Sequence, residues 1–547
     1  MIKTLRTFVI ILSSCFFVFS LAACSQSSNE SSNTATKDKA IKIAVSTNVD
    51  SLDPALAYES ISTEIVGNTM EGLYTIDNNN KPQLAMAEKV VTSSDGLTKT
   101  FTIRKDAKWS NGDPVTADDF VYAWSRLADP TLASGFNFEL EVAGIKNAAA
   151  ITAGKMKPSD LGVKAKDSKT LVVTLDKPVP FLPGLLSFSA FAPLDQKFVE
   201  SKGKSFALTS DDLVFNGPFV VKNWKANDNT LTLEKNPSYY DAKNVALKTV
   251  NIQVISDPQQ AVMSYQNGDI DYAPLNGDLV KKYSTDKSYQ NSLGIFEWYL
   301  MFNSKVDGLN NENLRKAIAY SIDRKELTDK ILKDGSIPAN TMVQKGFSFD
   351  PTDSKKDFVD EVPQGYSYDQ AKAKEYWDKA KAETKMRSFT LIYEQEDPSI
   401  ANVAAYMKSQ IESNLKGMTV NLQIMPKKTR LDKMQKGDYQ VALTRWGPDY
   451  ADPTAILSMY TSKHVSNYAG WSNKDFDNLL NAAATTLAQK PADRWTALEK
   501  AEGILNDSAV CIPLYQVGDS ALVRTNIDGL VKHFTGVDFR YKYASLK

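Results

Sequence analysis

The pattern between residues 389 and 424 constrains the fold of this chain most, because it fixes how two strands run. Residues 389–393 place apolar side chains at every second position, as a strand does, and residues 420–424 repeat the pattern. Between them, Asp397-Pro398 supplies a helix N-cap and a proline at the first helical position, and Gly417 lies where a helix-ending glycine belongs. A strand, a helix and a strand in this span form a βαβ crossover, which makes the two strands parallel. The sequence therefore predicts an α/β fold.

Weaker patterns predict further elements along the chain. A helix is expected from Ser62 to Leu73, where Ile65, Val66 and Met70 share one face. Asp118-Asp119 precede another apolar helical stripe, so we interpret them as first-turn charges that favour the helix dipole. Alternating strands are expected at residues 41–46, 97–103, 170–175, 219–224, 230–234 and 249–255.

The N-terminus indicates export. Leu21-Ala22-Ala23-Cys24 closes an apolar run that follows Lys3 and Arg6 and is shorter than the roughly 20 residues of a membrane span. These four residues resemble a bacterial lipobox, which would make residues 1–23 a lipoprotein signal peptide and leave Cys24 acylated. The alternative is an ordinary signal peptide with a chance cysteine. The polar residues 24–39 then form a flexible tether, and we expect the protein on the extracellular face of the bacterial cell membrane.

Composition excludes several classes of function. Without its signal the chain has 524 residues, more than one core usually holds, so we expect two or three lobes. It keeps 62 basic and 65 acidic side chains, a net charge of −3, which does not attract nucleic acid.

Cysteines and histidines are too few for a disulfide framework or a metal site. Cys15 leaves with the signal and Cys24 would be acylated, so only Cys511 remains, and we expect it to be a buried apolar residue. His464 and His533 have no partner at metal-binding spacing, and no metal or cofactor is expected. The chain also has no nucleophile elbow, phosphate loop or dinucleotide-binding turn, and we expect no enzyme. An exported hydrolase that uses two distant carboxylates is the alternative.

Eight blocks of sequence carry a family resemblance. They are Ser51-Leu52-Asp53-Pro54, Met70-Glu71-Gly72-Leu73-Tyr74, residues 109–120, Asn216-Gly217-Pro218-Phe219, residues 236–240, residues 267–271, residues 314–318 and Trp446-Gly447-Pro448-Asp449-Tyr450. In this order they resemble the extracellular solute-binding proteins of peptide ABC transporters, the oligopeptide-binding lipoprotein family. Together they cover nearly all of residues 40–547.

The resemblance implies a two-lobed α/β fold like that of periplasmic binding proteins, with a hinge and a small extra domain. Residues 40–74, 212–303 and 516–547 would form lobe I, residues 75–211 the extra domain, and residues 304–515 lobe II. Two crossings between the lobes make a hinge that can close on a ligand. The implied partners are a peptide, the permease subunits of an ABC importer and the membrane, and the protein would be a monomer.

The resemblance also implies a set of ligand-binding residues. An extended peptide would pair its main chain with a first strand at Tyr58, Glu59 and Ser60 and a second at Arg445, Trp446 and Gly447. Asp449 would bind the ammonium group of the peptide. Because Asp452-Pro453 already starts the next helix, Asp449 is not needed as its cap.

Each site residue has a structural alternative. Asp449 could stabilise its own turn, Trp446 could pack in a core, and Tyr58 and Glu59 could lie in a plain surface loop. Asn216-Gly217 fit a turn beside the hinge as well as a ligand contact. No basic residues match those that hold a peptide carboxylate in the family, so ligand length and sequence preference stay open. A dipeptide, or another small solute such as a nickel chelate, is the alternative ligand.

Overall fold

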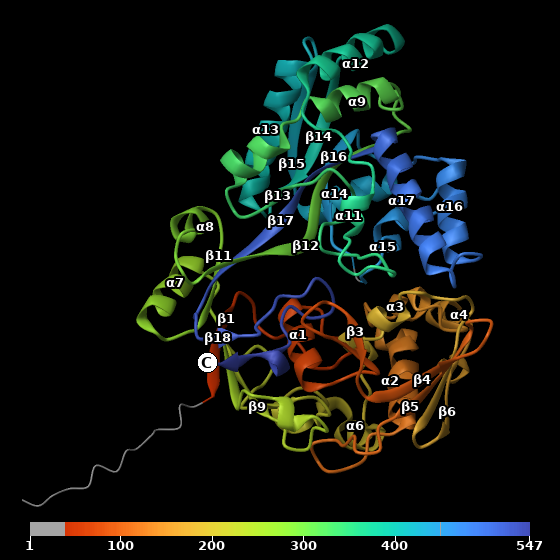
Figure 1. Cartoon of the computed structure of the whole chain (residues 1–547), viewed down its shortest axis with the longest axis vertical. Coiled ribbons are helices and arrows are strands. Elements are labelled where there is room, and N and C mark those ends of the chain that lie inside the picture. The colour runs from red at the N-terminus through yellow and green to blue at the C-terminus, as the bar shows by residue number, and fades with distance from the viewer. Residues whose placement is uncertain (1–38, 449) are drawn as a thin grey trace, which may run out of the picture. The chain divides into compact units, whose positions relative to one another are not determined.

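The computed structural model describes residues 39–448 and 450–547, and Lys39–Lys547 forms one compact unit of mixed α/β structure (Figure 1). The predicted signal peptide, Cys24, the tether up to residue 38 and Asp449 lie outside the described residues. No helix within the described part of the chain is long and apolar enough to span a bilayer.

One large sheet runs through the unit and determines where its cores lie. Residues far apart in the sequence are neighbours in it, since β1 pairs in parallel with both β10 and β11. In spatial order the strands are β15 (Thr419–Met425), β14 (Ser388–Glu394), β16 (Val441–Trp446), β12 (Tyr289–Phe302), β17 (Cys511–Val523), β11 (Tyr272–Leu275), β1 (Ala40–Val45), β10 (Thr249–Val254), β9 (Thr230–Lys235) and β8 (Phe219–Lys222), with β13 (Ile337–Pro338) on β17.

The predicted βαβ unit is confirmed. β14 and β15 pair in parallel through seven residue pairs, and α13 (Pro398–Asn414) connects them. The Asp397 side chain accepts a hydrogen bond from Ser399 N at 2.9 Å, and Gly417 has a φ of +90°. The apolar stripe of α13 packs with α9 (Glu312–Tyr320) and α12 (Gln370–Glu383) into one core on this part of the sheet, while α16 (Lys474–Ala484) and α17 (Pro491–Ser508) contribute to a second core.

The other predicted strands exist with their ends moved by one or two residues, but one helix prediction was wrong at both ends. α1 runs from Ser60 to Thr69 instead of from Ser62 to Leu73. It ends early because Met70 takes an extended backbone, with φ −125° and ψ 129°. The start of α2 (Ala117–Ala128) agrees with the first-turn interpretation of Asp119, which forms a capping box with Thr116.

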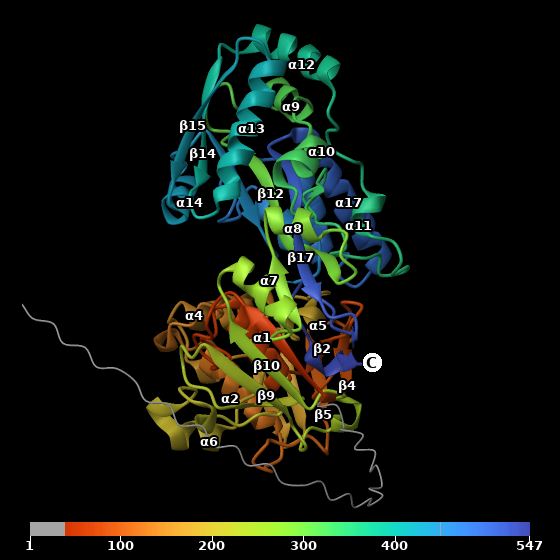
Figure 2. The same ribbon diagram turned by 90° about the vertical axis from the view of Figure 1, so that its left-hand side faces the viewer.

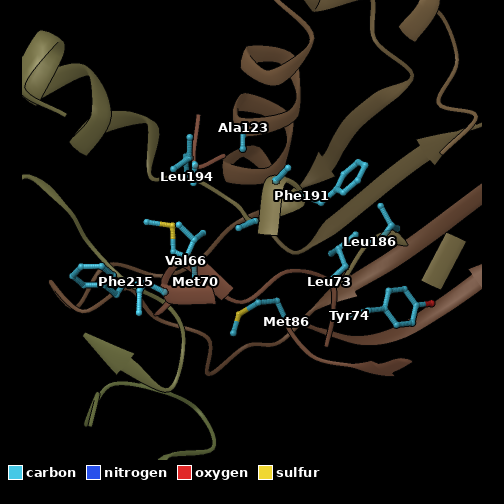
Figure 3. Close-up of a cluster of buried hydrophobic side chains, with 14 of the residues drawn as sticks. Val66, Met70, Leu73, Tyr74, Met86, Ala123, Leu186, Phe191, Leu194 and Phe215 are labelled. Carbon is cyan, nitrogen blue, oxygen red and sulfur yellow. The ribbon is translucent and has the colours of Figure 1, made fainter. Parts of the chain in front are cut away.

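The segment predicted to be an extra domain contains its own small sheet. Its strands are β4 (Ala87–Thr92), β5 (Thr98–Ile103), β7 (Thr170–Thr174) and β6 (Val163–Asp167). Its apolar core is nevertheless continuous with the core around α1. Figure 3 shows Val66 of α1 and Met70, the residue that follows this helix, in one cluster with Ala123, Leu186 and Phe191.

The buried apolar side chains form two groups. One group comes from residues 41–280 and 521–544, and the other comes from residues 298–515. The long antiparallel strands β12 and β17 run through both regions (Figure 2). Their pairing shifts register between Leu293 and Glu297 and again between Trp298 and Tyr299. The chain is therefore two-lobed, with these strands joining the lobes.

Candidate functional site

A cleft of about 390 Å³ lies where the two groups of elements meet. Its walls come from the start of α1, the loop before α3 (Phe138–Val142), the register shift in β12, the end of β16 and a segment near the C-terminus. The lining residues are Tyr58, Ser60, Thr63, Phe136, Phe188, Gly294, Ile295, Phe296, Gly447, Pro448, Val517, Asp519, Lys532, His533, Phe534, Thr535, Gly536, Val537 and Asp538.

The cleft brings together residues from both segments that the sequence singled out. Tyr58 and Ser60 line it from one side and Gly447 from the other. The expectation that Tyr58, Glu59 and Ser60 form a strand was wrong, because Ser60 is the first residue of α1 and Glu59 is its N-cap. The Glu59 carbonyl accepts a hydrogen bond from Thr63 N at 3.0 Å, which commits its oxygen to the helix start. A ligand that makes main-chain contacts on this side would meet the N-terminus of α1 and the residues before it.

The second predicted segment is a strand. Arg445 and Trp446 end β16 and pair with Trp298 and Glu297 of β12. The Arg445 guanidinium lies 4.7 Å from the centroid of the Phe296 ring, and Trp446 is 37% exposed. Among the described residues, β16 pairs beyond Ala442 with β12 alone. Leu443 and Thr444 are buried, so an added strand would reach only the end of β16 at Arg445 and Trp446.

Asn216 and Gly217 lie elsewhere and form a turn. The Asn216 side-chain amide accepts a hydrogen bond from Glu71 N at 3.0 Å and donates one to Glu71 O at 2.9 Å. Gly217 N donates to Thr69 O at 2.8 Å, and a Cβ at Gly217 would stand 2.7 Å from the carbonyl carbon of Thr69. The contacts of both residues thus agree with the turn alternative, and neither residue lines the cleft.

Charged residues that sequence reasoning missed lie on one side of the cleft. Lys532 forms ion pairs with Asp519 and with Asp538, the latter at 3.2 Å. Burial alone would lower the pKa of Lys532, but the two carboxylates outweigh it and raise that pKa. His533 is also buried, and burial, aided by Arg540, lowers its pKa to about 4. The imidazole is therefore neutral at neutral pH, and the lining carries two carboxylates against one ammonium.

The cleft has the composition of a binding site. Five aromatic rings face the same cavity as the charged group, and its volume lies near the lower end of the range of about 300–1,000 Å³ for small-ligand sites. Among residues 39–448 and 450–547, no cluster of three or more His, Cys, Asp or Glu side chains is arranged to hold a metal ion. Cys511 is buried in a core, as the sequence predicts.

Two lobes joined by a pair of long strands, with a cleft between them, define a two-lobed solute-binding protein. The family model of bacterial extracellular solute-binding proteins, family 5 (Middle), matches residues 81–468. The chain belongs to this family. It is 33% identical to a dipeptide-binding protein of Lactococcus lactis, over 96% of each chain.

Solved structures agree with this assignment. The chain is 35% identical to Listeria monocytogenes OppA bound to peptide, with a TM-score of 0.73 over 94% of this chain and 100% of that one. It is 29% identical to the murein tripeptide-binding protein MppA in its unliganded open form, with a TM-score of 0.81 over 93% of this chain and 98% of that one. The arrangement of this chain is thus more similar to the open relative than to the peptide-bound one.

Proposed function

We propose that this protein is an extracellular receptor that binds short peptides in the cleft and delivers them to an ABC importer. The observation that carries the proposal is the meeting of Tyr58 and Ser60 with Gly447 and Pro448 around one cavity that both lobes line. Relatives named as dipeptide-binding and peptide-bound proteins support the ligand class. The function is binding without catalysis.

The two groups of buried side chains support a division into two lobes. We assign residues 40–74, 212–303 and 516–547 to lobe I, residues 75–211 to the extra domain and residues 304–515 to lobe II. The two crossings are β12 and β17, and the register shift beside Gly294 is the proposed hinge. A bulge leaves residues outside the ladder, so the pair can bend there without losing its other hydrogen bonds.

Asp449 is proposed to bind the peptide ammonium. Its neighbours support this role, because Gly447 and Pro448 line the cleft and Asp452 is committed elsewhere. Asp452 accepts a hydrogen bond from Thr454 N at 3.0 Å and forms a bidentate ion pair with Arg494 at 2.7 and 2.8 Å. Asp452 thus has partners of its own, and Asp449 is the carboxylate that we assign to the ligand.

The test measures peptide affinity by calorimetry for the wild type and for Asp449→Ala. Loss of a charge-assisted contact to the ammonium predicts weaker binding by roughly 10- to 100-fold. The control is Asp269→Ala, which removes an exposed carboxylate after α7 (Pro258–Asn267), outside the cleft lining. Equal affinities of Asp449→Ala and the wild type would remove the ammonium assignment, and a wild type that binds no peptide would refute the proposed function.

We further propose that lipid on Cys24 holds the receptor at the membrane. The lipobox-like residues 21–24 and the family's extracellular location support this. Cys24→Ser should move the protein from the membrane fraction to the medium, whereas Cys15→Ser should leave it in place. Retention of the Cys24→Ser protein in the membrane fraction would argue against the anchor.

A further inference from the structure

One wall of the cleft is a stack of aromatic rings. The rings of Tyr58 and Phe136 are stacked, with centroids 5.1 Å apart and planes at 22°. Phe188 meets Phe136 edge to face, with centroids 5.2 Å apart. Tyr58 is nevertheless 49% exposed, so the stack keeps a free aromatic surface at the cavity.

A glycine holds the outermost ring of this wall in place. A Cβ at Gly135 would stand 2.2 Å from Cε1 of Tyr58, so the ring lies directly against the backbone of that residue. Contact of this kind fixes the ring position, since only glycine leaves room for it. The exposed face of Tyr58 is thus presented by a rigid support.

The register shift of β12 contributes another exposed ring to the cavity, and this ring also lies against a glycine. Phe296 is 40% exposed, and a Cβ at Gly447 would stand 2.8 Å from its Cδ1. The Arg445 guanidinium lies over the same ring, 4.7 Å from its centroid. Phe296 is therefore held between a glycine and a cation, and it lines the cavity from the register shift of β12.

The exposed rings of Tyr58 and Phe296 line one cavity, and their chemistry indicates which part of a ligand they would contact. Exposed aromatic area is unfavourable in water, and burial of a phenylalanine-sized side chain between rings adds stacking contacts to the hydrophobic gain. The charged residues of the lining do not compete for this place, because Lys532 is already paired with Asp519 and Asp538.

We propose that the rings of Tyr58, Phe136 and Phe188, with Phe296 opposite, form a subsite that selects peptides by one apolar side chain and favours an aromatic one. The subsite rests on the proposed peptide-binding function and narrows its ligand class. Closure of the lobes would enclose that side chain among these rings.

The test is calorimetry of the purified full chain with matched tripeptides. Trialanine is compared with the three tripeptides that carry a single phenylalanine, and with tripeptides that carry a single lysine or glutamate. At one position, phenylalanine should tighten binding roughly 10- to 100-fold over alanine, the gain expected for burying one such side chain. Lysine and glutamate at that position should give no such gain.

Substitutions in the protein then show which residues cause the preference for the phenylalanine peptide. In Phe296→Ala the affinity ratio of the phenylalanine peptide to trialanine should fall to roughly threefold or less. The control is Phe138→Ala, which removes a phenylalanine that is 44% exposed on α3 and does not line the cleft, and it should keep the wild-type ratio. Tyr58→Ala, a change at an exposed side chain, tests the other wall if the Phe296 variant folds poorly.

The outcomes separate the two proposals. Equal affinity of all tripeptides for the wild type, or a gain with lysine or glutamate instead, overturns the aromatic subsite and leaves the peptide receptor standing. An unchanged ratio in both Phe296→Ala and Tyr58→Ala also overturns the subsite. If the wild type binds no peptide at all, the proposed function fails and the subsite fails with it.

Discussion

Glu64 is a buried carboxyl group in α1, with 4% of its surface exposed. Tyr541 donates its hydroxyl hydrogen bond to Glu64 Oε1. Burial, and then the nearby Asp538, raise the Glu64 pKa from 4.5 to about 8, although Tyr541 and Lys532 act in the opposite direction. The carboxyl is therefore mostly protonated in the folded protein at neutral pH, and its ionisation opposes folding.

This pKa predicts how stability depends on pH. A folded pKa above the unfolded value gives a contribution that is complete below about pH 4.5 and is lost as pH rises toward 8. The limiting slope for one proton is about 1.4 kcal/mol per pH unit. Glu64→Gln keeps an acceptor for Tyr541 and removes the ionisation, so its advantage over the wild type should grow between pH 5 and pH 8.

Denaturant unfolding at pH 5, 6.5 and 8 measures this advantage. The control is Glu59→Gln, which replaces an exposed carboxylate at the N-cap of the same helix. If the two variants follow the same pH dependence, Glu64 does not titrate in the range that its burial predicts.

The burial and contacts of a residue could not be predicted from the sequence where they depend on a distant segment of the chain. α1 is buried from Ile61 to Thr69, including Glu64, because residues around Phe539 and Tyr541 cover it. The spacing of the apolar residues in this helix predicts one buried face, and it gives no sign of the C-terminal segment that covers the other faces. The stack of Tyr58 on Phe136 and Phe188 likewise joins separate segments, although the exposed Gly135 beside Phe136 was a local signal of close packing.

The elements that join the lobes were also missed, whereas the βαβ unit was predicted. The unit follows from local periodicity, with strands and helix in one short span. β12 and β17 instead depend on pairing between residues 289–302 and 511–523, and their ladder is interrupted by register shifts. Neither strand shows the regular alternation of a half-buried strand, because the second half of β12 and most of β17 are buried on both faces.

Gly518 of β17 allows another segment to approach the joining strands. Leu293 is its partner in β12, next to the register shift. A Cβ at Gly518 would stand 2.2 Å from the carbonyl carbon of Gly335 and 2.5 Å from Ser336 N. Both contacts are backbone atoms, which cannot rotate away as a side chain would.

We expect Gly518→Ala to lower the free energy of unfolding by about 1–3 kcal/mol, the usual cost of overpacking. The control is Gly184→Ala in α5 (Leu182–Leu185), where an added Cβ meets nothing within 4 Å, and this change should have little effect. Denaturant unfolding compares the two. Equal stability of both variants would show that the segment at Gly335 moves away freely.

At the scale of the whole unit, the proposed extra domain also contacts the proposed lobe II directly. Phe181 stacks on Tyr450, with ring centroids 4.1 Å apart and planes at 14°. Lys81 Nζ donates to Ser354 Oγ at 3.0 Å. The stack on Tyr450 connects residues 75–211 to the segment that follows β16, in addition to the core that they share with α1.

Ligand binding should change the whole unit, because the chain is more similar to an open, unliganded relative than to a peptide-bound one. A peptide that contacts both lobes stabilises the closed arrangement by its difference in affinity for the two states.

At 100 times its dissociation constant, a peptide adds about 2.7 kcal/mol to the free energy of unfolding. We therefore expect a higher melting temperature and a smaller radius of gyration by X-ray scattering when peptide is added. The N-acetylated peptide lacks the ammonium group and should produce smaller changes at the same concentration. A raised melting temperature without compaction would mean that the peptide binds one lobe alone, and the proposed hinge closure would be wrong.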